Sequence, residues 1–431
     1  MKASSPFRCS EMDAHLAFRF TAEDVAGEPL RLHLGVCGSV AAYRALDLVR
    51  QWQDIGFSVG VTMTPSAQRF VTPLPFEALG AEPVYTAMYE DPHASTPFAH
   101  LEPGQTARAF VVAPASAATL ARLAHGAADE LLACQVLAFR GPLVVAPAMN
   151  PAMWEHPATR ANMDILRSRG CVTVQPGIGR TACGDMGQGR LADSRLILLA
   201  GLRAALPQDL AGMRALVTLG PTREGWDGVR FWSNPSTGTM GASLALALWL
   251  RGAEVHAVCG PGVPWLPAGA GTEGMSTPLL RVEVTSARQM FEAASDLWND
   301  MDMGVFTAAV ADFSPQPAGP GKFKKSEAPE GFDLHFVPNP DILRTLSLNR
   351  RKDAPQKVMG FAAESENLHT AVRSKLAAKR ADMLVGNLLG HGFATVSNTV
   401  FVADRTGREA VMENLPKPVL AWRLVSWLAS L

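Results

Sequence analysis

The chain has 431 residues, more than one compact core usually holds, so we expect two or three domains. Hydrophobic residues make up 48% of it and charged residues 18%, a balance typical of ordered proteins with large cores rather than of disordered chains. The net charge of −1 predicts no general attraction to nucleic acid or to an anionic membrane surface, so any anion site has to be built locally.

The cysteines and the apolar runs narrow the class of protein further. The six cysteines lack the paired spacing of a zinc site, and the first residues lack the basic-then-apolar pattern of a signal peptide. The longest apolar helical run, 240–250, is too short to span a bilayer. We therefore expect free thiols, no membrane partner, no nucleic-acid partner and a cytoplasmic location.

The first half of the chain has the pattern of alternating strands and helices. Residues 1–29 show no clear period, and we treat them as an N-terminal extension. A strand at 32–36, a glycine turn, a helix with Ala42, Leu46 and Val49 on one face, and a strand at 59–63 follow as a βαβ unit. Further strands are expected at 109–113, 143–146 and 172–174. Residues 30–205 therefore predict a doubly wound α/β domain.

An isolated amide side chain, Asn150, directly follows the buried strand 143–146. Ligands in open α/β sheets bind beyond the carboxyl ends of the strands, and an amide can donate a hydrogen bond to a carboxylate. Met149, Met153 and Trp154 could shield such a site from water. Asparagine before proline is also a typical helix N-cap, so a purely structural role for Asn150 stays open.

Three weaker signals accompany Asn150. The glycine-rich loop 181–190 carries Cys183, whose thiol could donate a proton, although the loop could equally be a flexible surface segment. His100, before the strand 109–113, could act as a base or simply be exposed. Ser39 follows the first strand and Ser116 follows the strand 109–113, at positions suited to a phosphate or a flavin edge.

The second half restarts the same pattern after a short linker near 200–213. A strand at 215–219 and a helix at 241–251 are followed by strands expected at 254–258, 303–307, 358–361, 383–385 and 400–402. Residues 206–431 therefore predict a second α/β domain with its own core. The fold class expected for the whole chain is α/β, with two Rossmann-like doubly wound domains.

Polar residues of the second half gather near strand ends and helix starts. Asn234 and the hydroxyls of 236–239 precede a helix, where backbone N–H groups could bind phosphate or where an ordinary capped turn could form. Three lysines within 322–325 could neutralise a triphosphate, or form a solvated charge run. Lys375 and Lys379, four residues apart on a predicted helix, add a cationic face.

Read together, the first-half motifs resemble the homo-oligomeric flavin-containing cysteine decarboxylases that act on phosphopantothenoylcysteine. The matching stretches are 35–44, 113–116, 147–150 and 182–190, with His100, and they cover about residues 31 to 200. The resemblance implies a flavodoxin-like flavoprotein domain in which FMN oxidises the substrate thiol to a thioaldehyde. The carboxylate then leaves as carbon dioxide, and the enethiol is reduced and protonated.

The same resemblance implies residue roles. His100 would be the base, Asn150 would hold the substrate carboxylate beside Met153, and Cys183 would protonate the product. The positions implied for FMN are Gly38, Ser39, Thr64, Ala115 and Ser116.

The second half, about residues 213 to 425, resembles the CTP-dependent phosphopantothenate–cysteine ligases. The resemblance implies that CTP activates 4′-phosphopantothenate as an acyl-cytidylate with release of pyrophosphate, that Mg²⁺ bridges the triphosphate, and that the cysteine amine displaces CMP. Asn234 and Lys322 would be catalytic, and Arg230, Asn234 and Ala309 would bind substrate. The positions implied for the nucleotide are Phe306, Thr307, Ala308, Asp312, Lys322, Pro340, Asp341, Ile342, Leu343, Phe361, Lys375 and Lys379. No residue is assigned to the metal.

One departure from the ligase pattern is Thr239, where that family usually has lysine, and it leaves the ligase efficiency open. The alternative function is an FMN-binding regulatory flavoprotein with weak or no ligase turnover. The two resemblances together imply homo-oligomers, trimeric decarboxylase units joined through ligase dimers.

Overall fold

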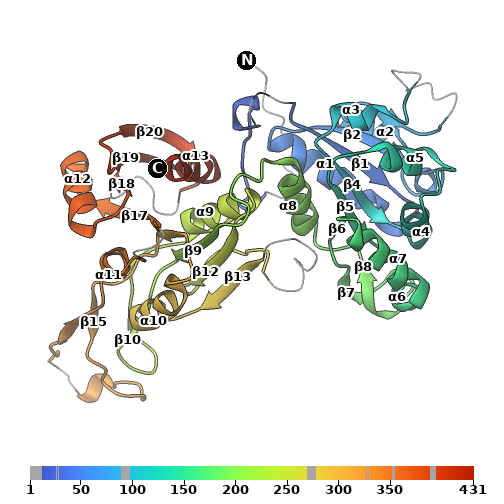
Figure 1. Ribbon diagram of the computed structural model, residues 1–431. Coiled ribbons are helices and arrows are strands. Elements are labelled where there is room, and N and C mark those ends of the chain that lie inside the picture. The colour runs from blue at the N-terminus through green and yellow to red at the C-terminus, as the bar shows by residue number, and fades with distance from the viewer. Residues whose placement is uncertain are drawn as a thin grey trace. The chain divides into compact units, whose positions relative to one another are not determined.

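The computed structural model describes residues 12–25, 27, 29–88, 98–268, 278–327, 330–351, 355–388 and 395–431. It divides into two compact units (Figure 1). We call Arg19–Gln208 the N-terminal unit, and Asp209–Leu266 with Leu279–Leu431 the C-terminal unit, with which residues 12–18 also cluster. Each unit contains one large sheet whose central strands are parallel.

The N-terminal unit is a six-stranded parallel sheet in the order β3-β2-β1-β4-β5-β6. Its strands are β1 (Arg31–Val36), β2 (Ser58–Met63), β3 (Val84–Tyr85), β4 (Ala109–Ala115), β5 (Leu143–Pro147) and β6 (Val172–Thr173). This is the Rossmann order, with its topological switch point between β1 and β4, whereas flavodoxin itself has the five-stranded order 2-1-3-4-5. The expected doubly wound α/β class is confirmed.

Helices pack on this sheet in two groups. Helix α1 (Arg44–Asp54) contacts α8 (Ser194–Ala205), while α4 (Ala117–His125) contacts α5 (Leu131–Ala138) and α7 (Pro157–Ser168). The expected buried face of the first helix is partly wrong, because residues 40–43 form a separate 3₁₀ turn, η2 (Val40–Tyr43), ahead of α1. The face that α1 buries is Ala45, Leu48, Val49 and Trp52, and Leu46 is only half-buried. The shorter elements are η1 (Ala22–Val25), η3 (Ala67–Arg69), α2 (Leu74–Ala78), α3 (Glu102–Thr106), α6 (Pro151–Glu155) and the hairpin β7 (Gly177–Arg180) with β8 (Met186–Arg190).

The C-terminal unit has an eight-stranded sheet in the order β13-β12-β9-β14-β17-β18-β19-β20. Its strands are β9 (Arg214–Leu219), β12 (Glu254–Cys259), β13 (Leu279–Glu283), β14 (Met303–Phe306), β17 (Lys357–Glu364), β18 (Met383–Leu388), β19 (Ser397–Asp404) and β20 (Glu409–Pro416). The first six strands of the order are parallel, and the last two are antiparallel. The parallel part repeats the strand order of the other unit, with its switch point between β9 and β14.

The helices of the C-terminal unit are α9 (Thr239–Leu250), α10 (Ala287–Trp298), α11 (Ile342–Leu348), α12 (Leu368–Lys379) and α13 (Lys417–Ser430). Helix α9 packs against α13, and α11 packs against both α10 and α12. Every residue from Gly241 to Leu250 is buried, which explains why this stretch is apolar on all sides. The small strands β10 (Glu224–Gly225), β11 (Phe231–Trp232), β15 (Phe313–Pro315) and β16 (Phe336–Pro338), with the turn η5 (Lys325–Glu327), form an arm that extends away from the sheet (Figure 1).

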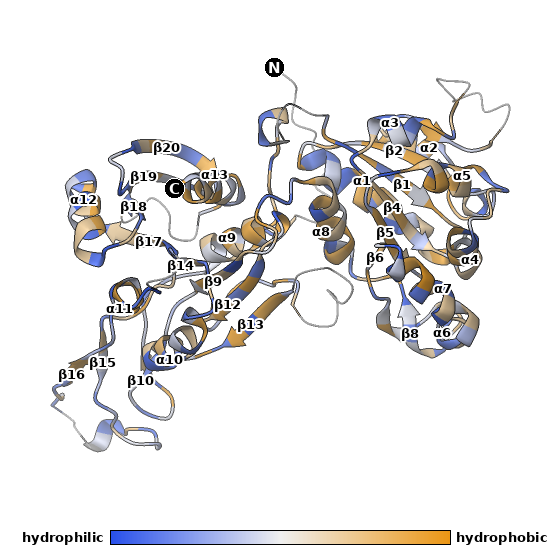
Figure 2. Ribbon diagram, viewed as in Figure 1, coloured by the Kyte–Doolittle hydropathy of each residue, from blue (hydrophilic) through white to orange (hydrophobic). Residues whose placement is uncertain are grey.

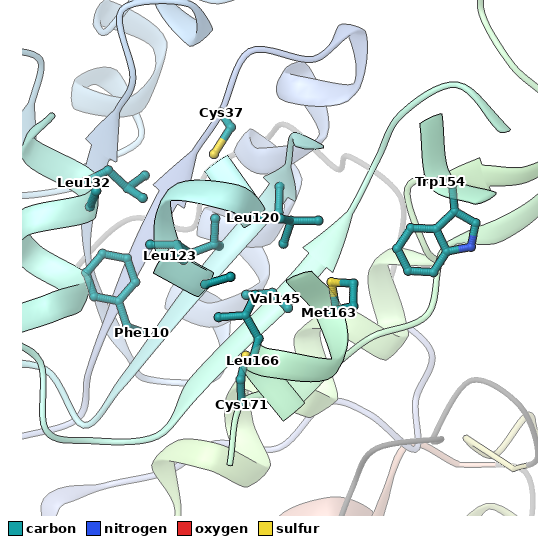
Figure 3. Close-up of a cluster of buried hydrophobic side chains, with 14 residues drawn as sticks. Cys37, Phe110, Leu120, Leu123, Leu132, Val145, Trp154, Met163, Leu166 and Cys171 are labelled. Carbon is teal, nitrogen blue, oxygen red and sulfur yellow. The ribbon is translucent and has the colours of Figure 1, made fainter. Parts of the chain in front are cut away.

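Each unit has its own hydrophobic core, as the hydropathy colouring of strands and helices shows (Figure 2). In one cluster of the N-terminal unit, strands β4 and β5 pack against helices α4, α5, α6 and α7. It contains Phe110, Val145, Trp154 and Met163, all fully buried (Figure 3). Among the described residues, no helix has both the length and the apolarity required to cross a membrane.

Candidate active sites

A cavity of about 690 Å³ lies beyond the carboxyl end of β5 in the N-terminal unit. Four segments line it: the η2 turn with the start of α1, the loop after β5, the β7–β8 hairpin, and the start of α8. The chemically important lining residues are Ser39, Arg44, Asn150, Cys183, Arg190 and Asp193. The strand ends of a doubly wound sheet are where such a cavity is expected.

The two sides of the Asn150 amide have different roles. Its Oδ1 accepts a hydrogen bond from the Ala152 amide at 2.8 Å and so caps helix α6. Its Nδ2 donates to Asp185 Oδ2 at 2.5 Å and to Cys183 Sγ at 3.2 Å. The helix-cap interpretation of Asn150 is therefore confirmed, and binding of a substrate carboxylate stays a prediction. The cap orients the amide so that its N–H₂ side, which contacts Asp185 and Cys183, faces the hairpin turn.

The β7–β8 hairpin carries Cys183 in its turn. The Thr181 amide donates to the carbonyl of Asp185 at 2.8 Å, and the Thr181 hydroxyl donates to the same oxygen at 3.0 Å. Residues 186–190, expected to be loop, form strand β8. Gly189 of this strand lies against the loop after β5. A Cβ added at Gly189 would lie 2.3 Å from the Met149 carbonyl oxygen, so only glycine fits this close approach. The hairpin is thus held against Asn150, since the Met149 amide donates to Gly189 O at 2.9 Å.

The thiol of Cys183 is exposed and is a stronger acid than an ordinary cysteine. Thr181 Oγ1 lies 3.1 Å from its sulfur, and the hydrogen bonds of the sulfur with Thr181 and then with Asn150 lower the pKa of the thiol. A lowered pKa favours release of the proton, the role expected for this residue.

We predict that Thr181→Val raises the pKa of Cys183, because valine removes the hydrogen bond with the largest effect on that thiol. The thiolate fraction at a given pH should fall, and alkylation by iodoacetamide should need a higher pH. The measurement is a pH profile of labelling at the Cys183 peptide by mass spectrometry. Thr181→Ser is the matched control and should keep the wild-type profile; an unchanged profile in the valine variant would contradict the assignment.

Asp185 is a site residue that the sequence did not single out. Its carboxylate accepts the Asn150 hydrogen bond and lies 3.6 Å from Cys183 Sγ. The Asp185 carboxylate therefore accepts the Asn150 hydrogen bond that a substrate carboxylate would need. Its position in the Ala-Cys-Gly-Asp motif was the only available signal.

His100 lies away from the cavity, in the exposed turn that precedes α3. A buried polar chain holds this turn. Gln135 Nε2 donates to the carbonyl of Ala99 at 2.9 Å, Thr62 donates to Gln135 Oε1 at 2.6 Å, and His33 Nε2 lies 2.7 Å from Thr62 Oγ1. Burial lowers the pKa of His33 to about 3, so its imidazole is neutral and donates to Thr62. These hydrogen bonds anchor the turn that contains His100. The imidazole of His100 does not line the cavity beside Asn150 of the same chain.

The residues expected at FMN lie at the carboxyl ends of β1, β2 and β4, but only Ser39 lines the cavity. Thr64 accepts a hydrogen bond from the Ala67 amide, and Ser116 caps α4 by accepting from the Thr119 amide. The other two, Gly38 and Ala115, do not line the cavity either. The volume is within the roughly 300–1,000 Å³ of typical ligand sites. Ser39 and Arg44 both line the cavity, and a hydroxyl with a guanidinium fits a ligand that carries a phosphate.

Of the three apolar residues expected to shield the cavity, Met149 lines it, whereas Met153 and Trp154 do not. Met153 is 50% exposed and does not line it. Trp154 is fully buried in the core beside Met163 (Figure 3), and its Nε1 donates to Gln188 Oε1 at 3.1 Å. The indole therefore anchors strand β8 instead.

A second cavity, of about 660 Å³, lies in the C-terminal unit at the carboxyl ends of β9, β14 and β17. It brings together most of the residues predicted for the nucleotide and its substrate, from five separate segments of the sequence. These are Asn234, Phe306, Ala308, Ala309, Asp312, Pro340, Asp341, Ile342, Leu343, Phe361, Lys375 and Lys379.

Charges in the second cavity are paired across its wall. Lys375 forms an ion pair with Glu364 at 2.6 Å, and Lys379 pairs with Asp341. Asp341 also caps α11 through the Arg344 amide at 3.0 Å. Asn234 Nδ2 donates to the carbonyl of Val310 at 3.0 Å, which fixes the amide at the cavity edge. Each lysine therefore already has one carboxylate partner, which offsets part of the positive charge that the cavity presents to an anion.

Three predicted residues are outside this second cavity. Lys322 and Arg230 lie on the arm, where Arg230 pairs with Asp227 at 2.7 Å and donates to the carbonyl of Phe323 at 3.1 Å. Thr307 lines a smaller adjoining cavity. Within the described part of the chain, no cluster of three or more histidine, cysteine or acidic side chains could hold a metal ion.

Comparison with protein families matches both halves of the chain. The model described as "DNA/pantothenate metabolism flavoprotein C-terminal domain" matches residues 210–431, and the model described as "Flavoprotein" matches residues 22–200.

Curated relatives match along nearly the whole chain. "Coenzyme A biosynthesis bifunctional protein CoaBC" of Mycolicibacterium smegmatis is 38% identical over 417 residues, 93% of this chain and 97% of that protein. The proteins of the same name from Mycobacterium tuberculosis H37Rv and Bacillus subtilis are 39% and 35% identical, over 92% of this chain and 96% of each relative. The chain therefore belongs to the family of bifunctional coenzyme A biosynthesis proteins, with a flavoprotein half followed by a DNA/pantothenate-metabolism half.

Proposed function

We propose that the chain makes 4′-phosphopantetheine from 4′-phosphopantothenate, cysteine and CTP in two consecutive steps. Residues 206–431 would form the amide, and residues 30–205 would decarboxylate it. The observation that carries the proposal is the contact of Asn150 with Cys183 at 3.2 Å, beside a cavity large enough for a cofactor and a substrate. An amide and an acidic thiol at one cavity suit a substrate that loses a carboxylate and gains a proton.

In the decarboxylase step, bound FMN would supply the two-electron oxidation at the thiol-bearing carbon and the later return of those electrons. Asn150 Nδ2 would donate to the substrate carboxylate once Asp185 releases it. Because carbon dioxide leaves without its negative charge, the electron pair of the broken bond stays on the substrate as an enethiolate. Cys183 would donate its proton later, when the enethiol takes back the two electrons and becomes the fully reduced product. His100 would remove the first proton.

In the ligase step, the second cavity would hold CTP near Phe361, with Lys375 and Lys379 beside its charged groups. The carboxylate of phosphopantothenate would attack the α-phosphorus and release pyrophosphate. The cysteine amine would then form the amide and release CMP. Mg²⁺ would enter with the triphosphate, whose oxygens are its natural ligands. Asn234, fixed by Val310, would donate to the oxygen on which charge develops during amide formation.

A homo-oligomer would complete both sites, as trimers of the decarboxylase half joined through dimers of the ligase half. His100 lies outside the first cavity, and Lys322 and Arg230 lie outside the second. A second copy of the chain could supply each of these residues. Exposed apolar side chains on the arm, among them Phe231, Trp232 and Phe313, support an interface there.

The test is a single reaction of the purified chain with FMN, 4′-phosphopantothenate, cysteine, CTP and Mg²⁺, followed by mass spectrometry. We expect the cysteine amide first and then a product lighter by carbon dioxide. Omitting CTP should abolish both, and omitting FMN should stop the sequence at the amide. Binding of FMN without either product would instead support the regulatory flavoprotein.

A further inference from the structure

A single polar side chain interrupts the buried face of helix α5. Leu131, Leu132 and Ala133 of this helix are buried, and Gln135 is fully buried as well. Burying an amide costs free energy unless it is hydrogen-bonded, and an apolar side chain would fill the same place without that cost. The glutamine therefore needs a specific reason in the fold.

Both ends of the Gln135 amide are paired, each with a different segment of the chain. Its Nε2 donates to the carbonyl of Ala99 at 2.9 Å, and its Oε1 accepts from the Thr62 hydroxyl at 2.6 Å. Because that hydroxyl has one proton and donates it to Gln135, its oxygen must accept from His33 Nε2, which lies 2.7 Å away. Nδ1 of His33 is then the unprotonated nitrogen, and within the described part of the chain it has no hydrogen-bond partner. The hydrogen bonds therefore run in one direction, from the sheet to the backbone of Ala99.

The sheet is shaped to hold the first members of this chain of hydrogen bonds. His33 on β1 and Gly60 on β2 lie opposite each other in the register, and a Cβ added at Gly60 would lie 2.7 Å from His33 Nδ1. Glycine thus makes room for the imidazole. The imidazole also packs against the ring of Phe110 on β4, with ring centroids 4.8 Å apart. Since His33 and Thr62 are both fully buried on strands, they give Gln135 a fixed anchor.

The hydrogen bond from Gln135 acts on the peptide group that leads into His100. The Ala99 carbonyl oxygen and the His100 Cα belong to one planar peptide unit, so fixing that oxygen restricts where the His100 side chain begins. Ala99 is buried in a small cluster with Tyr85 and Leu131, whereas His100 is exposed. The turn is therefore anchored on its inner side, and the imidazole is left accessible on the outer side.

The helix that follows the turn is held independently of Gln135. Glu102, the first residue of α3, forms an ion pair with Arg31 at 3.3 Å. The Leu101 amide donates to the carbonyl of Phe98 at 2.8 Å and closes the turn itself. Loss of the Gln135 amide should therefore loosen the turn while α3 stays in place.

We propose that Gln135 is a positioning residue for His100 in the decarboxylase half. The proposal rests on the proposed function for the chemistry of His100, which is to remove the first proton from the substrate. Gln135 acts through the Ala99 carbonyl, by fixing the peptide plane from which His100 projects. A general base works only within hydrogen-bond reach of the proton that it removes, and a displacement of about 1 Å can cost about a hundredfold in rate.

The test is the rate at which 4′-phosphopantothenoylcysteine reduces bound FMN in the full chain, followed without oxygen by stopped-flow absorbance. Gln135→Met keeps the length of the side chain and removes both hydrogen bonds, so the limiting rate should fall by about tenfold to a hundredfold. The substrate concentration that gives half of this limiting rate should not change, because a base that is only misplaced affects the transition state rather than the binding of substrate.

Two further variants calibrate this effect. Thr62→Val removes a hydrogen bond one step further from the turn, so it should slow FMN reduction in the same direction but by less. Gln208→Met is the matched control, because Gln208 likewise donates to backbone carbonyls, those of Arg203 at 2.7 Å and Leu206 at 3.0 Å, after the end of α8. The control should reduce FMN at the wild-type rate.

A double-mutant comparison separates positioning from general damage to the fold. In a chain that carries His100→Asn, adding Gln135→Met should slow FMN reduction no further, because no base is left to position. A purely structural role for Gln135 would slow FMN reduction by the same factor with or without His100. That result would overturn the proposal.

Amide hydrogen exchange measures the anchoring without any reaction. Peptides that cover residues 98–106 should exchange faster in Gln135→Met and at the wild-type rate in Gln208→Met. Unchanged exchange in Gln135→Met would overturn the proposal, and so would faster exchange with a wild-type rate of FMN reduction. A wild-type chain that binds FMN but is not reduced by the substrate would instead refute the proposed function, and the anchoring would then be judged by exchange alone.

Discussion

Replacing Cys183 by serine should separate the two halves of the decarboxylase reaction. Carbon dioxide should still be released, but the oxidised enethiol should accumulate, because a hydroxyl is a far weaker acid than a thiol whose pKa is already lowered by Thr181 and Asn150. Formation of the fully reduced product should slow by about 10²- to 10⁴-fold, the usual contribution of a general acid. Mass spectrometry of quenched reactions distinguishes the two products.

Serine also keeps most hydrogen bonds of the hairpin turn, so the cavity should persist. Cys134→Ser is a suitable control, since that half-buried thiol donates to the carbonyl of Ala128 and does not line the cavity. If the Cys183→Ser chain completes the reduction at the wild-type rate, Cys183 is not the proton donor.

The second large effect is expected from Asn234→Asp. The substitution removes the donor to the Val310 carbonyl and places a carboxylate against that oxygen, at the edge of a cavity proposed for a triphosphate. If Asn234 acts after activation, the acyl-cytidylate should form and accumulate, while amide formation slows by about 10²- to 10³-fold, as for loss of one preorganised donor.

Asn339→Asp is the matched comparison for Asn234. Asn339 Nδ2 likewise donates to a carbonyl, that of Ala311 at 2.8 Å, in the same cavity. A loss caused only by a misplaced negative charge would slow activation in both variants. Failure of Asn234→Asp to make any acyl-cytidylate would therefore place Asn234 in the first half-reaction, against the proposal.

Lys322→Gln should in turn block acyl-cytidylate formation, because the role proposed for Lys322 is to contact the triphosphate.

The strands that could be predicted from sequence are those buried on both faces. The runs that became β1, β4, β5, β9 and β12 are mostly apolar and are buried at every position after the first or throughout, and the structure confirms all of them. No comparable apolar run marks β3, which has two residues, or β20, whose positions are half-buried or exposed at the sheet edge. Edge strands bury too little apolar surface to show as a run.

The second cavity was predicted better than the first because its residues lie mostly on strand ends and helix starts. Asp185 was missed because its role depends on the folded chain. Its contact with Asn150 spans 35 positions, and depends on how the β7–β8 hairpin folds back.

The neutral imidazole of His33 has a consequence for acid tolerance. Its pKa is about 3 in the folded chain, mainly through burial, against 6.5 for an ordinary histidine. Below pH 6.5 the unfolded chain therefore takes up a proton that the folded chain refuses, and folding stability declines as the pH falls toward 3. The loss from this one residue amounts to up to about 5 kcal/mol, comparable to the whole stability of many domains. Acidification toward pH 3 should thus destabilise the flavoprotein half through a side chain that touches neither cavity, by about 2 kcal/mol at pH 5 and more below it.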